Sequence, residues 1–222
     1  MFTKVWFEEI ENILKSKGLD SDSSTFDEIK SNLKNKKILN SKEFASECIY
    51  VILASGFSQK TAKKIHSKII NFLFNSKETN FDVLYNYLIG LFNNKNKISA
   101  IIKIWLDKDA IVENYYKQTS LESRLLFLLK LPHIGKITVN HLARNLGENI
   151  VKYDIWIQRL GVLYSKNTNL NNKINNSKLD KDIKFVCDNM FSFMEKETSL
   201  PRGYIDVVLW KACQNGLINF NK

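Results

Sequence analysis

Apolar residues recur at helical spacing along almost the whole chain, and this periodicity is the strongest constraint on the fold. Phe44, Cys48, Val51 and Ile52 follow the i, i+4, i+7, i+8 pattern of one helix face. No stretch between turn residues alternates strictly between apolar and polar, as a half-buried strand would. The spacing therefore predicts an all-α protein. It places helices at about residues 81–92, 96–106, 108–117, 179–196 and 203–214, with a short extended piece near Asn149–Tyr153.

Pairs of capping residues and one polar run predict where helices start and where a loop lies. The pairs Thr25/Glu28 and Thr119/Glu122 have the spacing of a capping box, in which two side chains accept hydrogen bonds from each other's backbone amides. Residues 165–178 are polar and rich in Asn, which predicts a surface loop.

The charge balance favours a polyanionic partner. The 222 residues include 33 Lys and Arg against 23 Asp and Glu, a net charge of +10. An excess of this size is most often associated with nucleic-acid binding. A coding bias toward Lys and Asn would produce the same excess without any such partner.

The spacing of the metal-ligand and apolar residues excludes several classes of protein. The three cysteines lie far apart and the three histidines share no helix face, so neither zinc sites nor cysteine-bound iron–sulfur clusters have a ligand set. The longest apolar run, Cys48–Phe57, is half of the roughly 20 residues that span a bilayer. Acidic residues stand where a signal peptide has its apolar run. We therefore expect a cytoplasmic protein with no metal, no cofactor and no membrane partner.

One segment carries more information than the rest. Residues 131–147 read LPHIGKITVNHLARNLG; an amphipathic helix that ends before this segment runs into a tight turn, and a second helix follows. Gly135 allows another backbone to approach closely, and the N–H groups at the start of the second helix can hold one DNA phosphate. Lys136 adds positive charge at that place. An ordinary corner between two helices would show the same pattern.

The segment after this hairpin points to a family. Residues 152–160, KYDIWIQRL, place Asp154 at the N-cap of a helix some twenty residues beyond the hairpin turn. The two segments together resemble the helix-hairpin-helix–Gly/Pro–Asp superfamily of DNA glycosylases, whose hairpin has the form LPGhGxKTA, with h apolar, and whose Asp is catalytic. Weaker matches at 47–65, ECIYVILASGFSQKTAKKI, and 204–213, YIDVVLWKAC, extend the resemblance over about residues 44–214.

The resemblance implies an all-α, two-lobed fold with the active-site cleft between the lobes. One lobe would comprise residues 41–117 and the other residues 1–40 and 118–222, with the hairpin at 131–147. The protein would be a monomeric enzyme of the nucleoid that flips a damaged or modified base out of double-stranded DNA. Asp154 would stabilise the positive charge that builds on the deoxyribose as the N-glycosidic bond breaks. The same residue also suits a plain helix cap, and the two roles are compatible.

Three departures from the family pattern refine this expectation. His133 replaces the first hairpin glycine, which requires either some backbone strain or a less left-handed conformation. Tyr153 replaces the Val or Pro before the Asp. Ile137 occupies the position of the Schiff-base lysine of bifunctional members, and Lys136 lies about 100° away around the helix. The resemblance therefore implies a monofunctional glycosylase without an iron–sulfur cluster, nearest to the alkyladenine-type branch.

Further DNA contacts follow from the same resemblance. Phe57 and Gln59 lie in the loop that carries the family's intercalating residue, although Phe57 equally suits a hydrophobic contact with the next helix. The expected DNA contacts of the hairpin and the Asp segment are His133, Gly135, Lys136, Thr138 and Lys152. Basic residues that suit either a DNA contact or a solvated face are Lys60, Lys63, Lys64, Arg144 and Arg159. Aromatic candidates for the base pocket are Trp105, Tyr115 and Trp156.

The sequence leaves other hypotheses open. A non-catalytic DNA-binding protein would keep the hairpin and lose the pocket. A glycosylase with lyase activity would use Lys136 as its amine. A glycosylase acting on hypermodified bases of phage DNA would serve defence rather than repair. An all-helical protein whose charge is only coding bias would show no salt-sensitive affinity for DNA.

Overall fold

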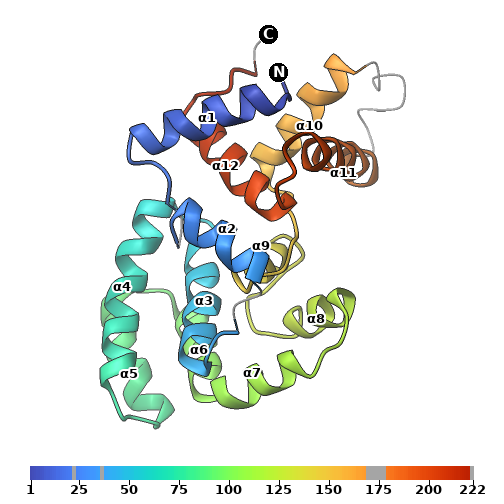
Figure 1. Cartoon of the computed structure of the whole chain (residues 1–222). Helices are drawn as coiled ribbons and strands as arrows, with labels where there is room; N and C mark the ends of the chain where they lie inside the picture. Colours follow the sequence, from blue (N-terminus) through green and yellow to red (C-terminus); the bar gives the residue numbers. More distant parts are fainter. Residues whose placement is uncertain (22–23, 36–37, 169–178, 221–222) are drawn as a thin grey trace. The chain divides into compact units, whose positions relative to one another are not determined.

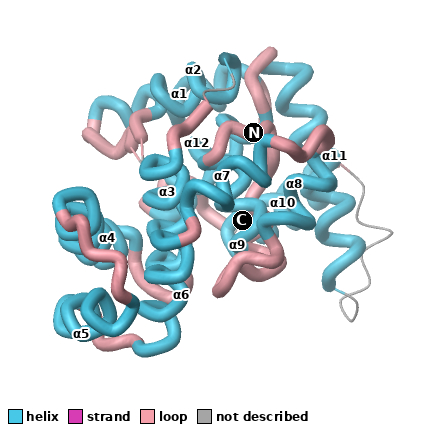
Figure 2. Tube along the Cα trace, turned by 90° about the horizontal axis from the view of Figure 1, so that it is seen from below, coloured by secondary structure: helices cyan, strands magenta, loops and turns pink. Residues whose placement is uncertain are grey.

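The structure, a computed structural model, describes residues 1–21, 24–35, 38–168 and 179–220. Within these residues it has twelve α-helices and no strand, and Ser21 and Thr25 form an isolated β-bridge (Figures 1 and 2). The all-α prediction is confirmed, and residues 149–153, where the sequence predicts a short extended piece, belong to no helix and no strand. The chain divides into two compact units. Unit 1 comprises Met1–Lys36 and Asn149–Lys222, and unit 2 comprises Lys37–Glu148.

Unit 1 is built around its last helix. Its helices are α1 (Lys4–Ser16), α2 (Phe26–Asn35), α10 (Ile155–Asn167), α11 (Leu179–Thr198) and α12 (Arg202–Gln214). Helix α12 packs against the other four, and its residues from Gly203 to Leu209 are all buried, as expected for a helix covered on every side. Gly203 permits the close approach, because a β-carbon there would lie 3.2 Å from the carbonyl oxygen of Ile150. The fully buried Tyr204 donates a hydrogen bond of 2.7 Å to Glu11 Oε1 on α1.

Unit 2 is built around its first helix. Its helices are α3 (Ser41–Ala54), α4 (Gln59–Asn75), α5 (Phe81–Leu91), α6 (Lys95–Leu106), α7 (Lys108–Tyr116), α8 (Leu121–Leu128) and α9 (Thr138–Asn145). Helix α3 contacts α4, α6, α7 and α9 (Figure 1). Its continuous buried run from Cys48 to Leu53 explains why the longest apolar stretch of the sequence lies here.

Two predicted helix starts have different outcomes. The capping box at α2 is confirmed, because Thr25 N–H donates to Glu28 Oε2 at 2.8 Å and Glu28 N–H donates to Thr25 Oγ1 at 3.3 Å. The predicted box of Thr119 with Glu122 is wrong by one residue. Helix α8 is capped by Ser120, whose hydroxyl accepts from the N–H of Ser123 at 3.1 Å. Thr119 and Ser120 both suit an N-cap, so residue type alone does not choose between them.

Residues 118–148 fall in unit 2, whereas the sequence suggested grouping them with the chain termini. The physical reason is the packing of α9 on α3 and of α8 on α7 and α9. Asn145 on α9 donates a hydrogen bond of 2.9 Å to Glu47 Oε2 on α3, which adds a polar link to this packing. The hairpin therefore belongs to unit 2, and Asp154 belongs to unit 1.

Candidate active site and nucleic-acid interface

Asp154 is held rigidly at the start of α10. Its Oδ1 accepts hydrogen bonds from the N–H groups of Trp156, at 3.0 Å, and Ile157, at 3.3 Å. The predicted N-cap is therefore present. The positive end of the helix dipole stabilises the negative charge of a carboxylate in this position. Only 14% of the side chain is exposed, so the charge lies at the edge of the core rather than in bulk solvent.

The two residues before the cap are fixed by partners on other helices. The backbone N–H of Lys152 donates to Asp206 Oδ2 on α12 at 3.1 Å. The hydroxyl of Tyr153 hydrogen-bonds Asp188 on α11, and the Tyr153 carbonyl accepts from Gln158 Nε2 at 3.0 Å. Sequence reasoning missed Asp206 and Asp188, because nothing in a helical pattern shows which distant carboxylate will face a loop. Together these contacts fix the backbone that presents the catalytic candidate.

The ammonium of Lys152 is directed to the carboxylate of Asp154. Its Nζ lies 3.3 Å from Asp154 Oδ2, and 17% of the Lys152 side chain is exposed. It also lies 5.2 Å from the ring centroid of Trp210, within the range of a cation–π contact. The expected DNA contact of Lys152 is thus accompanied by a direct contact with the catalytic candidate.

Of the three aromatic candidates for a base pocket, Trp156 is the one that neighbours Asp154. Its ring is partly buried, and it stacks on Phe220 with a centroid distance of 6.1 Å. Trp105 and Tyr115 are instead buried in unit 2, with 5% and 1% of their surface exposed. Their rings take part in the packing of that unit.

The hairpin between α8 and α9 is a tight turn anchored by buried apolar residues. Leu131 and Ile134 are buried, and the N–H of Ile134 donates to the carbonyl of Leu131 at 3.2 Å. Gly135 N–H donates to Thr138 Oγ1 at 2.7 Å, so the expected phosphate-binding residues Gly135 and Thr138 also stabilise the turn. Helix α9 ends at Asn145, and Gly147, just beyond its C-cap Leu146, has a φ of +91°.

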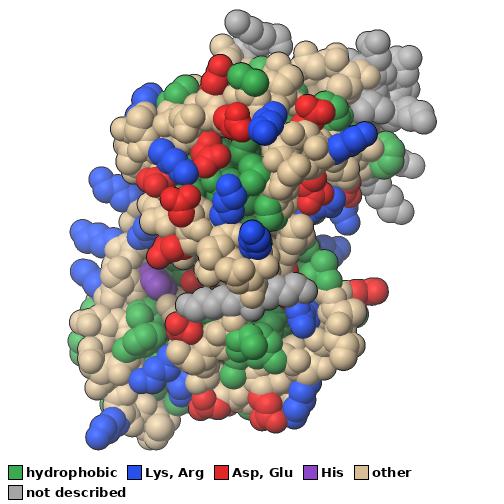
Figure 3. Space-filling model, in the orientation of Figure 1, with side chains coloured by type: hydrophobic (Ala, Val, Ile, Leu, Met, Phe, Trp, Pro, Cys, Tyr) green, Lys and Arg blue, Asp and Glu red, His purple; other side chains and the backbone are tan. Residues whose placement is uncertain are grey.

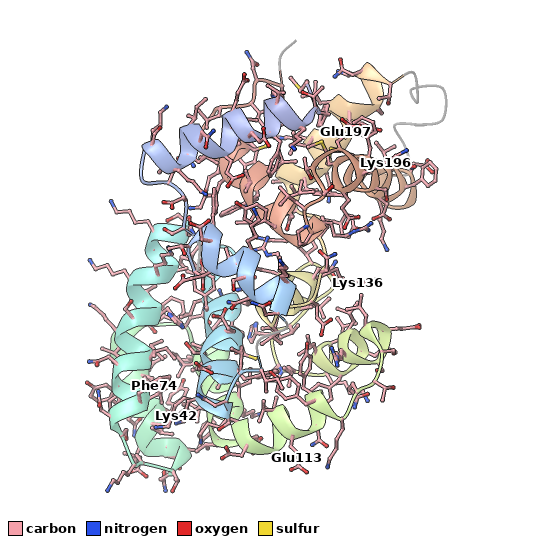
Figure 4. The ribbon with its side chains drawn as sticks, viewed as in Figure 1. Lys42, Phe74, Glu113, Lys136, Lys196 and Glu197 are labelled. Atoms are coloured by element: carbon pink, nitrogen blue, oxygen red, sulfur yellow. The ribbon has the colours of Figure 1, made fainter. Side chains whose placement is uncertain are left out.

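No side chain caps the start of α9. Ile137 occupies the N-cap with helical dihedrals and makes no side-chain cap hydrogen bond. Lys136 and Ile137 are both exposed, and Figure 4 shows Lys136 beside the turn. The beginning of α9 thus presents uncapped backbone and one ammonium to solvent, which suits an anion.

His133 has a left-handed backbone, with φ of +61°. A side chain in this region crowds the following carbonyl, which costs about 1–2 kcal/mol. Substitution by glycine should therefore stabilise unit 2, and part of the gain is offset by the greater freedom of glycine in the unfolded chain. We expect His133→Gly to raise the free energy of unfolding by about 0.5–1 kcal/mol in denaturant titrations. His133→Ala is the control, since alanine keeps the strain. Equal stability of the two variants would contradict the explanation.

The loop between α3 and α4 exposes an aromatic ring. Phe57 is 43% exposed and packs edge-on against Phe92, with ring centroids 5.6 Å apart. Lys97 lies beneath it, with Nζ 4.8 Å from the ring centroid and 2.5 Å from the carbonyl oxygen of Ser55. Burial lowers the pKa of Lys97. Gln59 begins α4 and is partly exposed. The loop is thus supported from below, and the Phe57 ring is accessible.

Positive charge is concentrated in unit 2. This unit has 16 Lys and Arg against nine Asp and Glu, whereas unit 1 has 17 against 14. Lys60, Lys64 and Lys68 are exposed at intervals of four residues on α4 and form one basic face. Figure 3 shows Lys and Arg side chains along the outer side of this helix. Arg144 differs from these because it is buried.

Among the described residues, no cysteine thiol is exposed as a nucleophile and no side chains cluster as metal ligands. All three cysteines are free and buried. Burial, with the charges of Asp154 and Asp206 adding to it, raises the pKa of the Cys213 thiol to about 12, so this sulfur stays protonated near neutral pH. The described residues contain no group of three His, Cys, Asp or Glu side chains able to surround a metal ion. They also contain no helix with the length and apolarity to cross a bilayer.

Comparison with known proteins identifies the fold. No family model matches the sequence, and no curated protein matches it. Among solved structures, the 8-oxoguanine glycosylase/lyase of Methanocaldococcus jannaschii in complex with a 15mer DNA containing 8-oxoguanine matches with a TM-score of 0.67 and 18% identity, over 97% of this chain and 100% of that one. The 8-oxoguanine DNA glycosylase from the same organism matches with a TM-score of 0.64 and 18% identity, over 96% of this chain and 94% of that one. The DNA-glycosylase fold predicted from the hairpin and the Asp segment is confirmed.

Proposed function

We propose that this chain is a DNA glycosylase that hydrolyses the N-glycosidic bond of a damaged or modified base, with Asp154 as its catalytic carboxylate. The observation that carries the proposal is the fixed geometry of Asp154, whose Oδ1 is held by two backbone N–H groups at the start of α10. This carboxylate follows the hairpin in a fold shared with DNA glycosylases over almost the whole chain.

The proposed reaction needs a negative charge in a fixed place. As the base departs, the deoxyribose becomes oxocarbenium-like and carries positive charge near C1′. A carboxylate held below that carbon stabilises the charge without first having to reorganise. It can also orient the water that attacks C1′. The target base must leave the helical stack first, and Phe57 is the exposed ring that we propose fills the gap.

The hairpin and the basic face of α4 are the proposed DNA-binding surfaces. The start of α9 offers uncapped backbone next to exposed Lys136. Lys60, Lys64 and Lys68 would follow a phosphate backbone without reading its sequence. The 8-oxoguanine in the neighbour's complex makes oxidised guanine the first base to test. Alkylated bases, deaminated bases and the hypermodified bases of phage DNA are the next to test.

We propose that base removal is hydrolytic and that the protein does not cleave the strand afterwards. Ile137, not lysine, occupies the hairpin position from which bifunctional family members are expected to supply their amine. Lys136 is one residue earlier and exposed to solvent. A lyase acting through Lys136 is the second candidate, and it would form a covalent complex with DNA that borohydride traps.

The test uses duplexes that each carry one damaged or modified base, including modified phage DNA. Strand breaks are scored with and without hot alkali. Breaks that need alkali are the expected result, because hydrolysis leaves an intact strand with an abasic site. Breaks without alkali, lost on Lys136→Met, would favour the lyase. Salt-sensitive binding with no base release from any duplex would favour a DNA-binding protein without catalysis.

A further inference from the structure

The ammonium of Lys152 pairs with Oδ2 of Asp154, the carboxylate oxygen that takes no part in the helix cap. Oδ1 is bonded to the N–H groups of α10, whereas Oδ2 lies 3.3 Å from Lys152 Nζ. The two side chains are 17% and 14% exposed, so water and salt screen this pair only in part.

This ion pair conflicts with the role proposed for the carboxylate. A carboxylate stabilises a sugar cation through its uncompensated negative charge. An ammonium at ion-pair distance compensates that charge and also repels any second cation brought to the same oxygen. In the arrangement that the structure shows, Asp154 is therefore neutralised on Oδ2, the oxygen to which the helix cap donates no hydrogen bond.

Lys152 can release the carboxylate without any movement of the backbone. Its own N–H is fixed to Asp206 Oδ2 at 3.1 Å, while its side chain is a flexible four-carbon stem. The ammonium also faces the ring of Trp210 at 5.2 Å, an aromatic surface that favours a cation.

We propose that Lys152 is a counter-ion switch. In the free protein it neutralises Asp154, and in the complex a phosphate of the bound DNA takes the ammonium and uncovers Oδ2. The inference rests on the proposed function, because it concerns the same carboxylate. The group that draws the ammonium away must be an anion, and a DNA substrate brings phosphates on both sides of the sugar that reacts. The switch thus couples exposure of the catalytic charge to the presence of DNA.

The test is a double-mutant cycle in DNA binding. The probe is a duplex with a tetrahydrofuran abasic analogue, which has no glycosidic bond and cannot react. The dissociation constant is measured as a function of salt for the wild type, Lys152→Met, Asp154→Asn and the double variant. Lys196→Met is the matched control, because Lys196 is an exposed lysine on α11 of the same unit (Figure 4).

The switch predicts two results. Lys152→Met should reduce the slope of log K against log salt by about 0.9, the effect of losing one phosphate contact. Asp154→Asn should tighten binding about fivefold, because the ammonium no longer has to leave an ion pair. This gain should vanish when Lys152→Met is already present. Lys196→Met should leave the slope and the affinity as in the wild type.

Three results would overturn the switch: an unchanged salt slope, an equal gain from Asp154→Asn with and without Lys152, or a borohydride-trapped complex with a natural abasic site that is lost in Lys152→Met. The last would make Lys152 a nucleophile. Because the probe cannot react, the cycle does not depend on excision. If the base is released but the effect of Asp154→Asn on DNA affinity does not depend on Lys152, the switch alone is refuted. If that effect depends on Lys152 but no duplex releases its base, the proposed function alone is refuted.

Discussion

Replacing Asp154 with Asn is expected to lower the single-turnover rate of base release about a thousandfold, as the loss of a preorganised charge does in other active sites. The carboxamide caps a helix as well as the carboxylate does, so α10 should keep its start and the protein its stability. The neutral side chain has no charge with which to stabilise the sugar cation. The rate is measured with enzyme in excess over the duplex that gives the best release in the base panel.

The matched control is Glu197→Gln, which removes one negative charge from an exposed site of the same unit (Figure 4). It should release the base at the wild-type rate. If Asp154→Asn also did so, at equal protein stability and with all of the duplex bound, Asp154 would be only a helix cap and the catalytic group would lie elsewhere.

Replacing Glu148 with Ala is expected to lower the free energy of unfolding of unit 2 by about 2–3 kcal/mol. Glu148 Oε1 accepts from the hydroxyl of Tyr115 on α7, at 3.0 Å, and pairs with Arg124 Nη1 on α8, at 2.5 Å. Burial raises the pKa of Tyr115, and the charge of Glu148 adds to this effect, so the phenol is held protonated as a donor. Alanine would leave a buried hydroxyl and a largely covered guanidinium without their acceptor. Chemical denaturation followed by circular dichroism measures the loss.

Glu113→Ala provides the comparison. Glu113 also pairs with a cation, Lys117 at 2.7 Å, but both side chains are more than 60% exposed (Figure 4). Water solvates the partner when such a pair is broken, so the denaturation midpoint should stay that of the wild type. Equal midpoints for Glu148→Ala and Glu113→Ala would show that the buried network adds nothing to stability.

The local features of the fold were predictable because they depend on neighbouring residues. Helix α7 was expected at residues 108–117 and lies at Lys108–Tyr116, since apolar spacing and caps act within a few residues. The Asp154 cap was predicted for the same reason. The grouping of residues 118–148 was not, because it depends on α9 packing against α3, about a hundred residues earlier in the chain.

The environment of the candidate site depends on such distant contacts. Trp105 and Tyr115 are of the residue types expected in a base pocket. However, Phe74 stacks on Trp105, and Phe44 packs against Tyr115. Lys152 and Asp154 are two residues apart, a spacing that puts side chains on one face of extended backbone, but the helical periodicity of the sequence does not pair them. The pair forms because irregular backbone between Asn149 and Asp154 is held by α11 and α12.

The hydrogen bond between Tyr204 and Glu11 spans 193 positions of the chain. During synthesis, α1 and α2 leave the ribosome well before α12, the helix against which they pack. Unit 2 is continuous in sequence and can complete its core as soon as residue 148 has emerged. A nascent chain therefore passes through a stage in which the hairpin is already folded while Asp154 still lacks the helices that fix it. The order of translation thus places the folded hairpin before the fixed carboxylate.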